Sequence, residues 1–219
     1  MSRCLALAVL LSLCLSGPAL AGAWPREKGT VFLSLAGQAE GPDEHGIYRQ
    51  NFTLYAEYGL TDRLTLGVDA GGDALRMTKA IGFLRWPLGR TDRRVKLAFE
   101  LGAGQVDGEN ALRPGLSLGR GVEIGKRHGW LAADGRAILF TGGGMSLEAD
   151  LTFGLSITKR SKVILQIQAG QPDLGDAYAR FAPSFVFETK PGAHIEFGLI
   201  EPLIGGGERG LKLGLWRKF

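Results

Sequence analysis

Three histidines are the residues of this sequence whose type most readily supports catalysis or metal binding. His45 ends the run Asp43-Glu44-His45, His128 follows two basic residues, and His194 precedes Glu196 by two positions. Carboxylate oxygens and imidazole nitrogens are common ligands of divalent cations. A run of consecutive polar residues is, however, typical of a solvated loop tip, and a single His–Glu pair supplies too few ligands. The sequence therefore predicts no metal site and no cofactor.

The sequence also lacks the spacings that nucleophilic or phosphate chemistry needs. The glycine runs at 142–144 and 205–207 lack the Lys-Ser/Thr ending of a phosphate-binding loop, so they indicate turns. Side chains two positions apart on a strand share a face, which would suit a histidine–serine pair. The residues two positions after the histidines are instead Ile47, Trp130 and Glu196. We therefore expect no enzyme activity and no catalytic residue.

Charged residues form a larger set, and they stand at every second position of apolar runs. From 146 to 157, apolar side chains at odd positions alternate with polar or small side chains at even positions. Period two is typical of a β-strand with two different faces, whereas a helix would mix both sets around its axis. The same alternation recurs at 48–58, 95–104, 163–170 and 211–219. Each expected strand therefore has one apolar and one polar face.

Turn residues separate these runs at regular spacing. Tight polar links at 61–63, 89–93, 125–129, 159–161 and 189–192 alternate with Gly/Asp-rich connections at 37–46, 71–74, 105–111, 141–144, 171–177 and 202–208. The runs between them predict twelve strands, at 29–37, 47–60, 64–72, 76–86, 94–105, 112–124, 130–140, 145–158, 162–171, 178–188, 194–201 and 209–219. Most of them are long enough to cross a bilayer when tilted.

Two of the expected strands break the alternation. In the fourth, Ile81 and Phe83 share a face with charged residues, and in the sixth Arg120 falls on the apolar face. A bulge near Gly119 would move Arg120 to the polar face. Ten strands is the alternative count if these two segments are not strands.

Composition and the first residues indicate one secreted domain. The 219 residues include 34 Gly and 9 Pro and are 45% apolar, which excludes a disordered tail and favours strands over helices. Arg3, the apolar run 5–15 and the sequence Ala19-Leu20-Ala21 are typical of a secretory signal peptide. We expect a signal peptide at 1–21, with cleavage after Ala23 as the alternative, and a single domain at 22–219.

Cysteine usage and charge narrow the classes of partner. Both cysteines, Cys4 and Cys14, lie in the segment that we expect to be removed, so the remaining domain must fold without a disulfide. The formal charge of +4 falls by one when Arg3 is removed, and the charges of both signs are interspersed. We therefore expect no nucleic-acid partner.

The alternation fits either a soluble sandwich or a membrane barrel, and three features favour the barrel. The polar faces carry many charged residues interleaved with glycine, which suits a narrow curved interior. Aromatic residues stand near the tight turns, as interfacial belts do, at Tyr58, Trp86, Trp130, Phe187 and Trp216. The last strand runs through Leu213 and Leu215 to a terminal aromatic residue, Phe219.

With these features the chain resembles a bacterial outer-membrane β-barrel protein of the small porin-like kind. The resemblance covers the whole chain after the signal peptide and implies an all-β, closed antiparallel transmembrane barrel in outer-membrane lipid. It implies tight periplasmic turns and short Gly-rich outer loops. It also implies that Leu213, Leu215 and Phe219 form the signal that the outer-membrane assembly machinery reads. Only a closed barrel satisfies every strand hydrogen bond in lipid.

The resemblance places the charged faces inside the barrel, lining a pore or forming an internal ion network. The expected lumen residues are Arg49, Glu57, Asp69, Lys79, Arg85, Lys96, Glu100, Arg113, Asp134, Arg136, Glu148, Asp150, Arg180, Glu188, Glu196 and Lys212. With Glu123, basic and acidic residues nearly balance, so we expect no strong ion selectivity.

We interpret the chain as a small channel or transporter for small polar solutes. A structural or adhesion-type barrel without transport is the first alternative, although the short outer loops argue against adhesion. A lipid-modifying outer-membrane enzyme is the second alternative, although such enzymes carry a histidine–serine pair that this chain lacks. The sequence leaves open whether the lumen is open or packed, which solute passes, and how many copies assemble.

Overall fold

The structure is a computed structural model that describes residues 22–90 and 92–219. The signal peptide expected at 1–21, with both cysteines, lies outside the described residues, as does Thr91 of the expected 89–93 turn. Among the described residues, no helix is long and apolar enough to cross a membrane.

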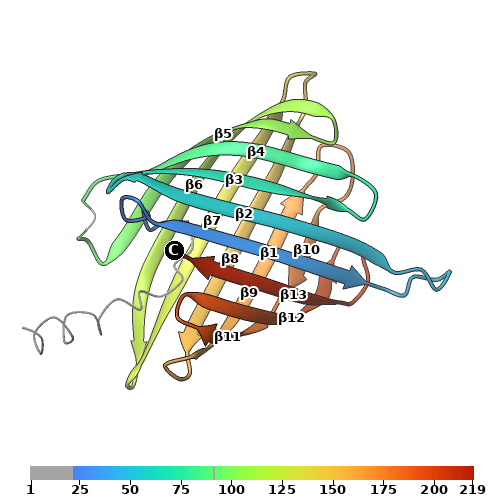
Figure 1. Cartoon of the computed structure of the whole chain (residues 1–219). Coiled ribbons are helices and arrows are strands. Elements are labelled where there is room, and N and C mark those ends of the chain that lie inside the picture. The colour runs from blue at the N-terminus through green and yellow to red at the C-terminus, as the bar shows by residue number, and fades with distance from the viewer. Residues whose placement is uncertain (1–21, 91) are drawn as a thin grey trace, which may run out of the picture.

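Antiparallel strands form a single sheet that closes on itself (Figure 1). The strands are β1 (Val31–Glu40), β2 (Arg49–Thr61), β3 (Leu64–Asp73), β4 (Met77–Pro87), β5 (Val95–Val106), β6 (Glu109–Ile124), β7 (Arg127–Phe140), β8 (Met145–Ser156), β9 (Ser161–Gln171), β10 (Tyr178–Phe181), β11 (Ser184–Lys190), β12 (Ala193–Ile204) and β13 (Gly210–Lys218). Neighbours in sequence pair along the sheet, and β13 pairs with β1. This last pairing closes the barrel.

β10 and β11 occupy one strand position between β9 and β12. Phe181 of β10 lies opposite Ile167 of β9, and Ser184 of β11 lies opposite Ile164, so the register continues across the break. The break falls at Pro183, which has no backbone N–H to donate to a neighbouring strand. The prediction of twelve strands in a closed antiparallel barrel is therefore confirmed, with the tenth strand in two pieces.

The outward face of the barrel is apolar over its whole circumference. Leu116, Leu151 and Leu213 lie on different strands, and each side chain is more than half exposed. The residues that alternate with them face inward and are polar, small or aromatic. An apolar exterior around a polar interior is the reverse of a soluble sandwich, and it is the arrangement that lipid requires.

The sixth strand carries no bulge. The registers of β6 with β5 and with β7 run without a shift past Gly119, and Arg120 lies opposite Val95 and Leu131. Both of these partners are exposed on the outer face, so Arg120 also points outward. The bulge that would have moved Arg120 to the polar face is therefore absent from β6. Arg120 lies near the periplasmic end of β6, where a long basic side chain can reach lipid headgroups.

Several large apolar side chains turn inward. Ile81 and Phe83 are 0% and 2% exposed, on the inner face that β4 shares with Lys79 and Arg85. The expected interfacial belt is wrong for Trp130 and Trp216, because both lie on inner faces, opposite Gly154 and His194. The interior therefore contains large apolar and aromatic side chains in addition to the expected charged residues.

Two outer connections are shorter than expected. β5 and β6 are joined by Asp107 and Gly108, which have φ angles of 50° and 86°. Two consecutive positive φ values are typical of a type I′ hairpin, for which Asp-Gly is a preferred sequence. β1 likewise continues through 37–40, which we expected to be loop. The strands therefore extend further toward the outer side than turn residues alone predict.

The two faces of β8 offer a direct test of the lipid-facing assignment. Leu151 is 56% exposed and Thr152 is 8% exposed. A fluorophore on Leu151→Cys should be quenched by brominated acyl chains after reconstitution in vesicles, and one on Thr152→Cys should not. Equal quenching at both positions would contradict the assignment of the faces.

Candidate functional site

Buried ion pairs join the inner faces of neighbouring strands. Arg85 of β4 pairs with Glu57 of β2 and, at 2.5 Å, with Glu100 of β5. Tyr55 donates its hydroxyl proton to Glu57 (2.7 Å) and accepts a hydrogen bond from Arg85 (2.9 Å). The side chains of Glu57, Arg85 and Glu100 are each 3% exposed. This group fills the interior next to β2, β4 and β5.

Further ion pairs continue the network around the wall. Arg113 of β6 pairs with Asp69 of β3 and, at 2.9 Å, with Glu100. Lys79 lies 3.0 Å from the same Asp69 carboxylate. On the other side, Arg136 of β7 lies 3.9 Å from Glu100.

Arg136 in turn pairs with Asp150 of β8 at 3.2 Å. Alternating charges therefore run from β2 to β8, and three arginines surround the carboxylate of Glu100. We call the set Glu57, Asp69, Lys79, Arg85, Glu100, Arg113, Arg136 and Asp150 the ion network.

Aromatic rings pack against this network. The guanidinium groups of Arg85 and Arg113 lie 5.0 Å and 5.7 Å from the centre of the Phe83 ring, and Tyr55 stacks on that ring at 5.7 Å. Cation–π contacts of this kind gain strength away from water. The Phe83 ring lies over Gly67, where an added Cβ would be 2.1 Å from it. A glycine on the inner face of β3 thus provides the space for the ring.

A second cluster, mainly apolar, fills the lumen toward the periplasmic end. Trp130, Ala132, Ile164 and Val186 come from β7, β9 and β11 and are buried, with Trp24 and Trp216 packed against them. The Trp130 ring lies over Gly154 of β8, where a Cβ would be 2.2 Å away. We call these six residues the tryptophan cluster. Val186 is fully buried on an inner face, so side chains cover the wall at this position.

The segment 22–30, before β1, enters the barrel from the periplasmic end. Trp24 lies over Gly119 of β6, where a Cβ would be 2.3 Å from its ring. Arg26 pairs with Glu57 of the ion network, and its backbone N–H donates to Thr65 (3.1 Å). Gly29 and Gly59 complete the attachment with backbone hydrogen bonds at the rim. The segment therefore links the tryptophan cluster to the ion network.

The wall formed by β8 to β10 is more polar than charged. Gln168 donates to Gln166 (2.8 Å), Gln166 donates to Thr152 (3.3 Å), and Arg180 donates to Gln168 (2.6 Å). Arg180 also lies 3.4 Å from Glu40 of β1. Amide groups that donate and accept thus lie on the inner face of β9, next to the Asp150 end of the ion network.

Smaller polar groups lie on β9 and β11 to β13. Lys212 pairs with Glu196 at 2.9 Å, and the Trp216 indole N–H donates to the same carboxylate at 3.0 Å. His194 lies 3.3 Å from Lys162 and 4.0 Å from Glu188. No group of three or more His, Cys, Asp or Glu suitable for a metal ion occurs within residues 22–90 and 92–219.

All the residues expected to line the lumen lie on inward faces by strand register. Eight of them form the ion network, and Glu196 and Lys212 form a separate pair. Asp134 accepts a hydrogen bond from Ser117 (2.5 Å), and Glu188 accepts one from the Gly192 amide (3.0 Å). Arg180 reaches Glu40, and Arg49 is exposed at the outer rim. Lys96 and Glu148 also face inward.

Sequence reasoning missed the residues that contribute from outside the alternating pattern. Trp24 and Arg26 precede the first strand, and Glu40 lies in a stretch that we expected to be loop. For Trp24 and Arg26, the sequence did offer one indication, because an aromatic and a basic residue stand directly after the expected signal peptide. Phe83 was recorded only as a break in the pattern, although it lies at the centre of the cation–π contacts.

The expected assembly residues lie at the seam where the barrel closes. Leu213 and Leu215 point outward from β13, and Phe219 follows its last residue. The Phe219 N–H donates to the Val31 carbonyl (2.9 Å), and the Val31 N–H donates back to Phe219 (3.3 Å). The end of the chain thus extends the pairing between β1 and β13, and its role as an assembly signal stays a prediction.

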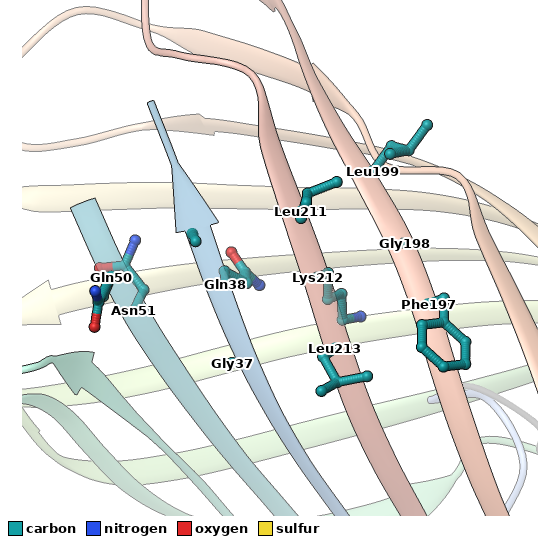
Figure 2. Close-up of a pocket in the computed structure, with 11 residues that line it drawn as sticks. Gly37, Gln38, Gln50, Asn51, Phe197, Gly198, Leu199, Leu211, Lys212 and Leu213 are labelled. Carbon is teal, nitrogen blue, oxygen red and sulfur yellow. The ribbon is translucent and has the colours of Figure 1, made fainter. Parts of the chain in front are cut away.

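A groove of about 700 Å³ lies along the same seam, on the barrel wall (Figure 2). Phe197, Leu199, Leu211 and Leu213 border it, and the small residues Gly37 and Ala39 of β1 leave it open. These residues belong to the outward faces of their strands. The groove is therefore part of the lipid-facing surface and not of the lumen.

Known structures share this architecture. An outer membrane channel from Pseudomonas putida F1 is 15% identical, with a TM-score of 0.58 over 93% of this chain and 100% of that one. The KdgM porin has a TM-score of 0.61 at 9% identity, over 85% of this chain and 99% of its own. The NanC porin has a TM-score of 0.63 at 9% identity, over 85% of this chain and 100% of its own.

The fold is that of outer-membrane channels and porins. No protein-family model matches the sequence, and no curated protein matches it either. The apolar exterior, the closed barrel and this shared fold place the protein in the bacterial outer membrane. The sequence-based expectation of a small porin-like barrel is confirmed at the level of the fold.

The ion network predicts a large stability effect at Glu100. Replacing Glu100 by Gln leaves three nearby arginines without this carboxylate, and breaking a buried ion pair typically costs about 3–5 kcal/mol. Glu100→Gln should therefore lower the urea midpoint of unfolding in detergent strongly. Glu44→Gln, in an exposed outer loop, should change the unfolding free energy by less than about 0.5 kcal/mol. Equal stability of the two variants would contradict the structural role of the network.

Proposed function

We propose that the protein is a gated channel for small polar solutes, closed by the segment 22–30. The observation that carries this proposal is the packing of Trp24 into the tryptophan cluster inside the barrel. Trp24 belongs to a segment attached to the wall by side-chain contacts and a few hydrogen bonds, and not to a strand of the barrel. Such a segment can leave the lumen while the strands of the barrel remain paired.

Exposure on the inner face supports an entrance on the outer side. Lys79, Asp150 and Arg180 lie toward the outer ends of their strands, and their side chains are 26%, 25% and 30% exposed. Deeper in the barrel, Glu57, Arg85 and Glu100 are almost fully buried. Water therefore reaches the outer part of the lumen, including Lys79 and Asp150 of the ion network, and is excluded from Glu57, Arg85 and Glu100.

The polarity of the lumen supports the solute class. Positive and negative side chains alternate along the ion network, so neither sign dominates the interior. The amide groups of Gln166 and Gln168 add donors and acceptors on β9, next to the Asp150 end of the network. A wall that offers both kinds of hydrogen-bonding partner suits neutral or zwitterionic polar solutes better than a single class of ion.

Current recordings in planar bilayers test the gate. Trp24→Ala removes the ring from the cluster, and Arg26→Ala removes the attachment to Glu57. A loss of about 1.4 kcal/mol of closing energy would raise the ratio of open to closed channels about tenfold. We expect wild-type protein to be mostly closed, both variants to open more often, and the open channels to discriminate weakly between K⁺ and Cl⁻.

Lys28→Ala is the matched control, because Lys28 belongs to the same segment but its side chain is exposed. It should open as rarely as the wild type. Absence of current from Trp24→Ala and Arg26→Ala, in samples shown to be folded by heat-modifiable migration on gels, would replace the channel by a sealed structural barrel.

A further experiment concerns assembly. Phe219→Ser keeps the backbone bonds to Val31 but removes the terminal ring, so we expect a severe drop in the fraction of protein assembled in outer membranes. Phe197→Ser removes an outward ring from β12 and serves as the control for lost lipid contact. If the two variants assemble equally well, Phe219 carries no assembly signal.

A further inference from the structure

Gly22, the first described residue, lies deep in the barrel against β6 and β7. An added Cβ on Gly22 would be 2.0 Å from Asp134 Oδ1 and 2.5 Å from Ser117 Oγ, so its backbone touches both side chains. From the rim inward, the segment passes Glu57 at Arg26 and then Gly119 at Trp24 before it reaches this point. Gly22 is therefore the innermost described residue of the segment.

Asp134 is a buried carboxylate that forms no ion pair within 4.0 Å among the described residues. It is 7% exposed and accepts one hydrogen bond, from Ser117 (2.5 Å). Its neighbour Arg136 directs its guanidinium to Asp150 and Glu100 instead. In the part of the chain that the structure describes, no Lys, Arg or His side chain forms an ion pair with Asp134. Arg136 is close enough for its charge to interact with that of Asp134, but it forms no ion pair with this carboxylate within 4.0 Å. A cation in direct contact would stabilise the buried carboxylate further.

We propose that cleavage between Ala21 and Gly22 creates the cation that binds Asp134. Hydrolysis by a signal peptidase breaks the bond between the Ala21 carbonyl carbon and the Gly22 nitrogen. The hydroxyl of water goes to the carbonyl carbon and its proton goes to the nitrogen, and the new acid then releases a proton that the amine takes up. The products are a carboxylate on the released peptide and an ammonium group on Gly22.

The position of Gly22 suits this role. Its nitrogen is one bond from the Cα that touches Asp134 and Ser117, and an ammonium group offers three donors where the uncleaved amide offers one. An α-amino group is mostly protonated at neutral pH, since its usual pKa is about 8. Cleavage after Ala23 would instead remove Gly22 and the fully buried Ala23, and Asp134 would then have no ion pair within 4.0 Å among the described residues.

Cleavage and gate closure are then coupled. The precursor has a neutral amide at Gly22, so the ion pair forms only in the processed protein and fastens the free end of the segment inside the barrel. The inference deepens the proposed function and rests on it, because the fastened segment is the gate. Release of the ammonium group from Asp134 becomes the first step of opening.

The position of cleavage is the first test. The intact mass and the N-terminal sequence of protein purified from outer membranes should show Gly22 as the first residue. A chain that begins at Trp24 would overturn the inference.

Amine labelling tests the ion pair itself. The folded protein in detergent is treated with an aldehyde reagent selective for α-amino groups, and the rate is followed by mass spectrometry. We expect the wild type to be protected and Asp134→Asn to react at least about tenfold faster. Glu123→Gln removes an exposed carboxylate from the periplasmic end of β6 and should react like the wild type. Equal rates for wild type and Asp134→Asn would overturn the inference.

A second variant keeps the carboxylate, so it covers the case in which Asp134→Asn fails to fold. Insertion of one serine between Ala21 and Gly22 moves the ammonium group one residue away from Asp134. This variant should be labelled as fast as Asp134→Asn, and protection equal to the wild type would overturn the inference. Labelling needs no current. A protected wild-type amine in a barrel that never conducts would therefore uphold the ion pair and remove only the channel function.

Discussion

Backbone hydrogen bonding in lipid is the constraint on which the rest of the structure depends. Every strand must pair on both sides, because hydrocarbon offers no partner for a free N–H or C=O. The pairing of β1 with β13 meets this requirement and closes the barrel. Closure then divides each strand into an outward apolar face and an inward face. Most charged side chains of the strands are therefore concentrated in a small interior.

The interior is crowded, and it accommodates its large side chains in two ways. Arginines reach past a neighbouring strand to carboxylates, as Arg85 of β4 does to Glu57 of β2 and Arg113 of β6 does to Asp69 of β3. Aromatic rings lie over glycines of neighbouring strands, as Phe83 does at Gly67 and Trp130 at Gly154. The arginine contacts thus join strands that are not neighbours in the sheet, and the ring contacts join neighbouring strands. Side-chain contacts thus connect the wall from β2 to β8, whereas the segment 22–30 belongs to no strand and is attached by the contacts of Trp24 and Arg26 and by hydrogen bonds at the rim.

The proposed gate depends on the difference between the wall, whose strands are joined by many side-chain contacts, and the segment 22–30, which is attached at a few points. The segment contributes one ring to the tryptophan cluster and one guanidinium to the ion network. Both clusters remain largely complete without it, because Glu57 keeps Arg85 and Trp130 keeps Ile164 and Val186. We therefore expect the barrel to keep its shape in both states of the proposed gate. A contact between Gly22 and Asp134 at the inner end of the segment gives the closed state a third attachment.

The sequence by itself determined the barrel, its strand number and the direction in which nearly every charged side chain points. Period two is a local property of strands, and closure in lipid follows from it physically. Only the tertiary structure decided what the inner residues contact, since Glu100 and Arg136 lie on separate strands and no local pattern relates them. It also decided that Phe83, Trp130 and Trp216 point inward, because an aromatic residue suits an interface or a crowded interior equally well. Trp24 and Arg26 turn inward because Gly119 leaves space for the Trp24 ring and Glu57 binds Arg26. Gly119 and Glu57 lie on different strands, and both face the same lumen only when the barrel closes.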